Sequence, residues 1–287
     1  MKIVTWNIQW CLGCDGRVDP RRIVDEARAF ADFDVLCLQE VASGFTTLKG
    51  SAGEDQFARL AELLPEYTAV RGVAVDVAAD VATQGGARRR FGNLILSRLP
   101  VHQVHRRCLP WPADAAVSSM PRMLLEAVVE APFGPLRIMT THLEYYSATQ
   151  RAAQVEALRD HHAEACGRAR IAGVGDDSQG PFQSQPQTVS AILTGDFNVR
   201  PDDPLLARLT APFDDAAVPP LDDVWRKLHP GHAQPPTSGV HDRAQWPEAF
   251  ACDFICASRD LRERLRAIEI DGDTQASDHQ PMMVELA

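Results

Sequence analysis

The sequence predicts an α/β fold, because short apolar runs with strand character alternate along the chain with segments of helical periodicity. The chain has 287 residues, 45% of them hydrophobic, which is enough to bury a large core. No repeat or break in composition divides it, so we expect a single domain spanning residues 1–287. The clearest strand-like runs are 2–6, 34–39, 136–141, 191–195 and 251–256.

Three segments show helical periodicity. The first begins at Asp19 and Pro20, where the aspartate can cap the helix and the proline suits its first turn. The second ends at Pro65, and the third begins at Ser147, with Gln150 completing a capping box. Their apolar stripes comprise Ile23, Ala27 and Phe30; Phe57, Leu60, Leu63 and Leu64; and Val155, Leu158 and His162.

Three aperiodic stretches, 79–90, 173–187 and 228–245, are rich in Gly, Pro, Gln, Asp or Arg and are expected to be loops. Loops of this length in a compact domain usually serve function, so we expect substrate selection to lie there. The chain enters a strand at Lys2 without a basic-then-apolar leader, and no apolar run is long enough to span a membrane. A cytoplasmic location is therefore expected.

The cysteines and two of the histidines are interpreted as structural. Seven cysteines, an odd number, favour reduced thiols over a disulfide framework. Cys11 and Cys14 have metal-site spacing, but no second Cys or His pair accompanies them. His161 and His162 are interpreted as surface and flank residues of the third helix. The cysteines expected in the core are Cys37, Cys252 and Cys256.

The net charge of −10 disfavours a protein that grips long nucleic acid, since lysine and arginine supply most of that affinity. The arginine runs at 88–90 and 106–107 are candidates for a local phosphate contact, although solvated loop faces are the favoured alternative. We see no stripe of interleaved aromatic and basic residues. These observations favour a small or lipid-like substrate, with nucleic acid as the alternative.

Polar and ionisable residues stand at the margins of the strand-like runs. Charge at the end of a buried strand is costly unless it is paired or bound to a metal. A whole series of such groups therefore predicts a site. The series comprises Asn7, Glu40, His142, Asp196, Asp253, Asp278 and His279.

Six ordered blocks around these residues resemble the endonuclease/exonuclease/phosphatase superfamily, and the resemblance extends over nearly the whole chain. It implies a four-layer α-β-β-α sandwich with two central mixed sheets, as in DNase I-like proteins. It also implies a divalent-metal phosphoester hydrolase site at one edge of the sandwich. The blocks are Thr5-Trp6-Asn7-Ile8, Leu38-Gln39-Glu40-Val41, Gly92-Asn93-Leu94-Ile95-Leu96-Ser97-Arg98, Thr141-His142-Leu143, Gly195-Asp196-Phe197-Asn198 and Ser277-Asp278-His279.

The resemblance assigns metal binding to oxygen ligands. We expect Glu40 to be the primary ligand, with Asn7 beside it and Asp278 as a third. Magnesium is the expected ion and manganese an effective substitute. Whether one or two ions bind is left open.

Catalytic roles follow in the same way. We expect Asp196 to orient or deprotonate the attacking water and Asn198 to hold a phosphate oxygen. His279 contacts the nucleophile or a phosphate oxygen, with Asp253 as its orienting partner. His142 is expected to stabilise the developing charge or to protonate the leaving group.

Two secondary blocks implicate Asn93 and Arg122 in substrate binding, with a strand cap and a structural ion pair as the respective alternatives. The chain departs from the family pattern at Ala251-Cys252-Asp253-Phe254, where many members have Arg-Ile-Asp-Tyr. A basic side chain and a hydroxyl are therefore missing.

Our leading hypothesis is a magnesium-dependent phosphodiesterase or phosphatase that acts on a small or lipid-like phosphoester. A DNA or RNA endonuclease or exonuclease of the same superfamily is the alternative. A non-catalytic scaffold is disfavoured by the intact series of polar residues, and a zinc hydrolase by the lack of histidine pairs at ligand spacing. The substrate and the oligomeric state do not follow from the sequence.

Overall fold

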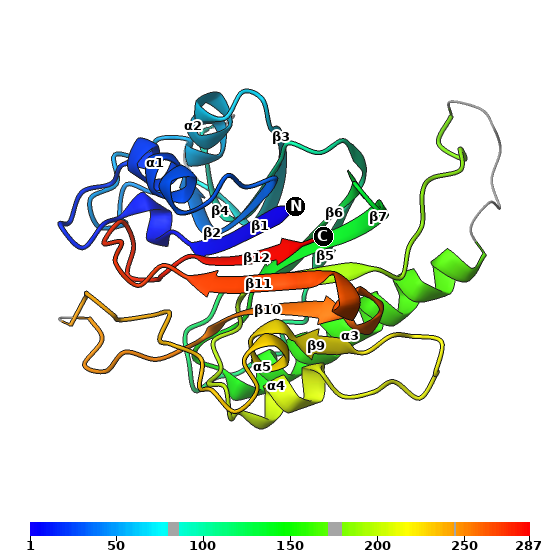
Figure 1. Ribbon diagram of the computed structural model, residues 1–287. Helices are drawn as coiled ribbons and strands as arrows, with labels where there is room; N and C mark the ends of the chain where they lie inside the picture. The colour runs from blue at the N-terminus through cyan, green and yellow to red at the C-terminus, as the bar shows by residue number, and fades with distance from the viewer. Residues whose placement is uncertain (80–85, 172–179, 244) are drawn as a thin grey trace.

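Two six-stranded sheets pack face to face, with helices on both outer faces, in a computed structural model that describes residues 1–79, 86–171, 180–243 and 245–287 (Figure 1). This arrangement confirms the expected four-layer α-β-β-α sandwich. No helix among the described residues combines the length and the apolar character needed to cross a bilayer. All seven cysteines lie in the described residues and are free.

The first sheet contains both chain termini. Within it β1 and β2 run parallel, and the other neighbouring strands are antiparallel. In spatial order its strands are β11 (Leu265–Ile270), β12 (Met282–Leu286), β1 (Lys2–Asn7), β2 (Val35–Ser43), β4 (Arg88–Ser97) and β3 (Thr68–Ala78).

The second sheet has the same plan, with one parallel pair, β7 and β8, among antiparallel neighbours. Parallel strands bring their carboxyl ends to one edge, so each sheet delivers two such ends to the same side of the sandwich. In spatial order its strands are β5 (Val101–Cys108), β6 (Met123–Ala131), β7 (Gly134–His142), β8 (Ala191–Asp196), β10 (Asp253–Ser258) and β9 (Leu221–Asp223).

Helices α1 (Pro20–Phe30) and α2 (Gln56–Leu63) cover the first sheet, and α3 (Ala148–Arg170) and α4 (Pro204–Leu209) cover the second (Figure 1). The predicted caps are present, because Asp19 and Ser147 accept hydrogen bonds from the first-turn amides of α1 and α3. The capping box is only half formed, since the Gln150 side chain donates instead to the Pro112 carbonyl. The remaining short helices are η1 (Gln9–Cys11), α5 (Val224–Leu228) and η2 (Arg259–Arg264).

Three apolar layers hold the sandwich together. The central layer lies between the sheets, where Ile3 and Ile95 of the first sheet meet Leu125 and Ile138 of the second. In the outer layers the helices pack on the sheets, and Phe57 of α2, for example, packs against the first sheet. Strand residues therefore bury both faces, which explains why their sequences are continuous apolar runs.

Three sequence-based expectations need correction. Arg88–Arg90 begin β4 rather than belonging to a loop, and Arg88 and Arg90 pair with Asp76 of β3, at 2.5 and 3.6 Å. The β2 strand continues past Glu40, which sits where the β2–β4 register shifts. In the three stretches expected to be loops, residues 80–85, 173–179 and 244 lie outside the described residues.

The third correction concerns His161, which is buried rather than at the surface, whereas His162 is buried on the inner stripe of the third helix as expected. Arg137 donates to Glu126 at 2.8 Å and to His162 Nδ1 at 3.1 Å, and His161 Nε2 lies 3.1 Å from Glu126. Burial alone would raise the pKa of Glu126, but the hydrogen bond from His161 and the charge of Arg137 lower it to about 2. Burial lowers the pKa of His162 to about 4, so this imidazole is neutral and accepts from Arg137.

We expect Glu126→Gln to lower the free energy of unfolding by about 3–5 kcal/mol, because it leaves the buried Arg137 charge without its partner. Urea denaturation measures this loss. Glu130→Gln is the matched control on the same strand, since Glu130 pairs with His102 at the surface and should cost about 1 kcal/mol or less. Equal losses in the two variants would contradict the importance of the buried network.

Candidate active site

The polar residues that end or interrupt the strands meet at one edge of the sandwich, and Asn7 joins those of the two sheets. Its side-chain amide donates to Glu40 Oε1 at 3.0 Å in the first sheet and to Asp196 Oδ2 at 3.1 Å in the second. Within the second sheet, Asp196 is the register partner of both His142 and Asp253. The packing of the sheets therefore brings these predicted site residues together.

Gly195 allows β8 to pass close to β7 just before Asp196. A Cβ atom at this position would lie 1.9 Å from the Thr141 carbonyl oxygen, and the residue has a φ of +138°. The following turn is fixed by Asn198, whose amide N–H donates to Asp196 at 2.9 Å and whose side chain donates to the Leu143 carbonyl at 2.8 Å. Asn198 itself adopts a left-handed φ of 51°, which asparagine tolerates better than most residues.

Glu40 occupies a strained position with a φ of 61°, at the register shift in β2. Its side chain is 17% exposed, and within the described residues Asn7 is the only hydrogen-bond donor to it. Burial, followed by repulsion from Asp278, raises the pKa of Glu40 to about 7. Burial and Asp253 raise the pKa of Asp196 to about 6. A cluster of carboxylates held this way is suited to a divalent cation, which would favour their charged forms.

His279 pairs with Asp253, its Nδ1 lying 2.8 Å from Asp253 Oδ2. Thr237 donates to the same carboxylate oxygen at 2.6 Å. Burial opposes the charged imidazole, but Asp253 and then Asp278 outweigh it and hold the pKa of His279 well above its usual value. The other ring nitrogen, Nε2, lies 3.8 Å from Asp196 Oδ2, so it faces the reacting edge.

His142 lies between the two carboxylates that Asn7 joins. Its Nδ1 is 3.8 Å from Glu40 and its Nε2 is 3.5 Å from Asp196. Burial, followed by the charges of Arg122 and His279, holds the pKa of His142 well below its usual value. The site therefore contains two imidazoles with opposite charge preferences.

The comparison that decides the family is a match to a family model described as the endonuclease/exonuclease/phosphatase family, over residues 4–279. The chain belongs to this family. Members of the endonuclease/exonuclease/phosphatase family hydrolyse phosphoesters. No curated protein shows significant similarity to the chain.

Solved structures share the fold across the whole chain. A family protein from Beutenbergia cavernae has a TM-score of 0.64 at 24% identity, covering 100% of this chain and 72% of its own. A mannosyl-6-phosphatase from Bacteroides thetaiotaomicron has a TM-score of 0.63 at 16% identity, and the match covers 100% of this chain and 99% of the phosphatase chain. D. rerio TDP2, complexed with single-strand DNA product, has a TM-score of 0.64 at 16% identity, and the match covers 100% of this chain and 98% of the TDP2 chain. At these identities the likeness shows the fold alone.

Asp278, in the last family block, is surrounded by donors that the sequence analysis did not identify. Its Oδ2 accepts from Gln9 at 3.0 Å, Gln245 at 3.1 Å and Trp246 at 3.0 Å. Gln245 is the last residue of the stretch expected to be a loop, and Trp246 follows it directly. No local pattern in the sequence marks them as neighbours of Asp278, since the fold alone brings them there.

Asn93 and Arg122, from the secondary family blocks, lie beside His142 along a narrow cavity. Asn93 donates to the Met123 carbonyl at 3.2 Å. Arg122 is buried and pairs with Glu144 at 3.2 Å, while its Nη1 has no hydrogen-bond partner among the described residues. Arg122 therefore forms the ion pair that was expected as its structural alternative. It also keeps an unpaired N–H group beside the site.

The thiol of Cys252 touches the site. Its Sγ lies 3.6 Å from Asp253 Oδ2 and 4.0 Å from His279 Nδ1. Burial raises the pKa of Cys252 well above its usual value, so the group is a neutral thiol. It is buried as the sequence indicated, but it packs against the imidazole–carboxylate pair.

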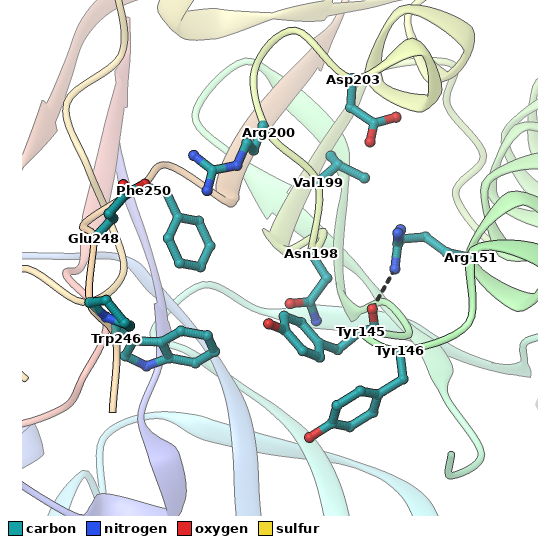
Figure 2. A pocket seen from close by; sticks show the side chains of 11 residues that line it. Tyr145, Tyr146, Arg151, Asn198, Val199, Arg200, Asp203, Trp246, Glu248 and Phe250 are labelled. Atoms are coloured by element: carbon teal, nitrogen blue, oxygen red, sulfur yellow. Dashed lines mark hydrogen bonds between the residues drawn. The ribbon is translucent and has the colours of Figure 1, made fainter. Parts of the chain in front are cut away.

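An open pocket of about 670 Å³ adjoins the site and is lined by aromatic residues (Figure 2). Tyr145 and Tyr146 follow β7, and Trp246 and Phe250 precede β10. Asn198 belongs to the lining, as does the basic side chain of Arg200. This gathering corrects the sequence-based view that no interleaved aromatic and basic surface exists.

We expect Gly195→Ala to lower the free energy of unfolding by about 3 kcal/mol or more, because the added methyl group collides with the β7 backbone in a conformation strained for alanine. Gly272→Ala is the control, since a Cβ there meets open space and should change stability by about 0.5 kcal/mol at most. Both values come from urea denaturation. A Gly195→Ala protein as stable as the control would refute the close approach of β7 and β8.

Proposed function

We propose that the protein is a magnesium-dependent phosphoester hydrolase whose single catalytic domain spans residues 1–287 and acts in the cytoplasm. The observation that carries the proposal is the bridge from Asn7 to Glu40 and Asp196. It assembles carboxylate oxygens from both sheets next to the His279–Asp253 pair. Membership of a family of phosphoester hydrolases supports the same conclusion.

Glu40, Asn7 and Asp278 are the proposed metal ligands. Carboxylate and amide oxygens suit magnesium, and manganese prefers the same ligand types. The charge cluster fits a cation, since the partly exposed Glu40 and the buried Asp196 both have raised pKa values next to other carboxylates. When bound, the ion supplies charge neutralisation and Lewis acidity to the phosphate oxygens.

In the proposed reaction the oxygen of a water molecule attacks phosphorus, and the ester P–O bond breaks. The proton of the water passes to Asp196, whose pKa of about 6 suits a base at neutral pH. The charged His279 donates from Nε2 to a phosphate oxygen, and Asp253 fixes its ring. Neutral His142 donates a hydrogen bond to the departing oxygen, which keeps the bonding electron pair and takes its proton from solvent.

Phosphate positioning is assigned to three further residues. Asn198 is proposed to contact a phosphate oxygen through its side chain, because it follows Asp196 on the same turn. Asn93 and the unpaired Nη1 of Arg122 are proposed to contact the substrate beside His142. A guanidinium group in this place would stabilise negative charge that develops on the phosphate.

A small or lipid-like phosphoester is the proposed substrate, and a polynucleotide is the second candidate. The net charge of −10 favours the first, since it weakens attraction for many phosphates at once. The structural neighbours fit both classes, because one is a mannosyl-6-phosphatase and another was solved with single-strand DNA. Discrimination therefore requires a direct measurement.

We expect Glu40→Gln to abolish metal-dependent turnover while preserving the fold, because it removes an anionic ligand at constant volume. The loss in kcat should exceed the roughly 10- to 100-fold that accompanies loss of an outer partner of a metal site. A chelator should abolish wild-type activity, and magnesium should restore it. Glu269→Gln, an exposed carboxylate on β11, is the control and should retain activity. Wild-type rates in Glu40→Gln at saturating substrate would overturn its assignment.

The second expectation separates the two substrate classes by their salt dependence. For a small ester, kcat/KM should change only slightly between low and moderate salt at constant magnesium. A polynucleotide held by six to ten phosphate contacts should lose about 10³- to 10⁵-fold over a fourfold rise in salt. We would compare a bis-aryl phosphodiester, a short single strand and a duplex. Fast, strongly salt-sensitive cleavage of either polynucleotide with poor turnover of the small ester would favour the nuclease.

A further inference from the structure

The aromatic pocket is physically continuous with the site. Asn198 forms part of its lining two residues after Asp196 (Figure 2). The Trp246 indole N–H donates to Asp278 at 3.0 Å. A group that occupies this pocket is therefore held next to the proposed reaction centre. Its volume of about 670 Å³ lies within the usual range for small-molecule sites.

The rings in the pocket stand nearly perpendicular to one another. Tyr145 meets Trp246 at 5.9 Å and 72°, and it meets Tyr146 at 4.8 Å and 88°. Trp246 meets Phe250 at 5.5 Å and 76°. Edge-to-face packing of this kind does not stack one ring face upon another. Tyr145 and Tyr146 remain 40% and 67% exposed, so ring faces are open to a ligand.

The polar groups of the pocket divide into structural and unpaired ones. Arg151 Nη1 donates to the carbonyls of Glu144 and Tyr145, at 2.7 and 2.8 Å, and thereby fixes the loop after β7. Arg200 instead lies 5.0 Å from the Phe250 ring centroid, and across the described residues it forms no ion pair. Its guanidinium therefore offers N–H donors that no ion pair occupies, in a lining that also contains Asp203 and Glu248.

We propose that this pocket binds the nucleobase of a nucleotide ester, and this inference rests on the proposed hydrolase function. A planar heterocycle can lie against an exposed tyrosine face and meet the neighbouring ring edge-on. The ring carbonyls and nitrogens of a base are acceptors for Arg200. The substrate class is accordingly a small phosphoester that carries a nucleoside.

The shape and polarity of the pocket oppose a lipid. It is open to solvent, and its lining mixes rings with arginine, asparagine and carboxylate groups, whereas an acyl chain needs an enclosed apolar channel. A hexose could also pack on aromatic rings. It would gain less from Arg200, because its hydroxyl groups are weaker partners for a guanidinium than the acceptor edge of a base.

Binding of non-hydrolysable analogues tests the proposal without turnover. Calorimetry in magnesium would compare a nucleoside 5′-methylenephosphonate with the same sugar phosphonate lacking the base and with a hexose methylenephosphonate. Stacking of one base supports a preference of about 10-fold or more for the nucleoside compound. Equal binding of the base-free compound, or equally tight binding of the hexose, would overturn the assignment.

Variants of Tyr145 localise the effect to the pocket. Tyr145→Leu should reduce the preference for the nucleoside compound to about 2-fold or less, because it keeps apolar bulk but loses the planar ring, and Tyr145→Phe should retain the preference. Tyr146→Leu provides a second, more exposed position in case the first variant does not fold. Full preference in both leucine variants would refute the pocket.

Phe182→Ala is the matched control, since it removes an 81% exposed ring elsewhere. Phe182 is not among the residues that line the pocket. The preference for the nucleoside compound should persist in this variant. Its loss would show that ring removal acts nonspecifically and would overturn the assignment.

Turnover measurements separate this inference from the hydrolase proposal. If the protein hydrolyses phosphoesters without any preference for a nucleoside, the nucleobase pocket is refuted and the hydrolase proposal stands. If the protein prefers to bind the nucleoside compound but turns over no phosphoester in magnesium or manganese, the nucleobase pocket stands and the hydrolase proposal is refuted.

Discussion

The Asn7 carboxamide contacts carboxylates from both sheets, and the geometry of the site depends on that contact. Its single NH₂ group lies 3.0 Å from Glu40 and 3.1 Å from Asp196, while its oxygen accepts from the Gln9 amide. Two buried carboxylates would otherwise repel each other, since a low-dielectric setting strengthens like-charge repulsion. The neutral amide separates them and supplies donors, so the two sheets can carry acidic groups to one edge without an arginine between them.

Much of the fold followed from the sequence because both sheets are buried on two faces. Such strands are continuous apolar runs, and the residues that interrupt or end them stand out, as Asn7 and Asp196 do. The α1 cap at Asp19 was equally visible, since its signal is local. The extension of β2 past Glu40 was not, because a register shift depends on the β4 partner rather than on the β2 sequence.

The parts of the site that escaped sequence analysis depend on contacts between distant segments. Trp246 reaches Asp278 from a loop without periodicity, and Tyr145 meets Trp246 across about one hundred residues of chain. His161 was misread because a histidine next to a helical stripe is ordinarily at the surface. Its burial is explained by its contact with Glu126 of β6, and the sequence of the helix gives no sign of that contact.

The division of labour between strands and loops has a consequence for how such a protein diversifies. Four of the groups proposed for the chemistry stand at strand ends, namely Asn7, His142, Asp196 and Asp253, whereas the tyrosines and Phe250 come from loops, which tolerate replacement. Ligand preference can therefore drift over generations while the reacting groups stay in place. Trp246 is the exception, because one side chain forms a pocket wall and also donates to Asp278. A lineage that changes this residue alters selectivity and chemistry in a single step, so the tryptophan limits which new preferences are accessible by gradual substitution.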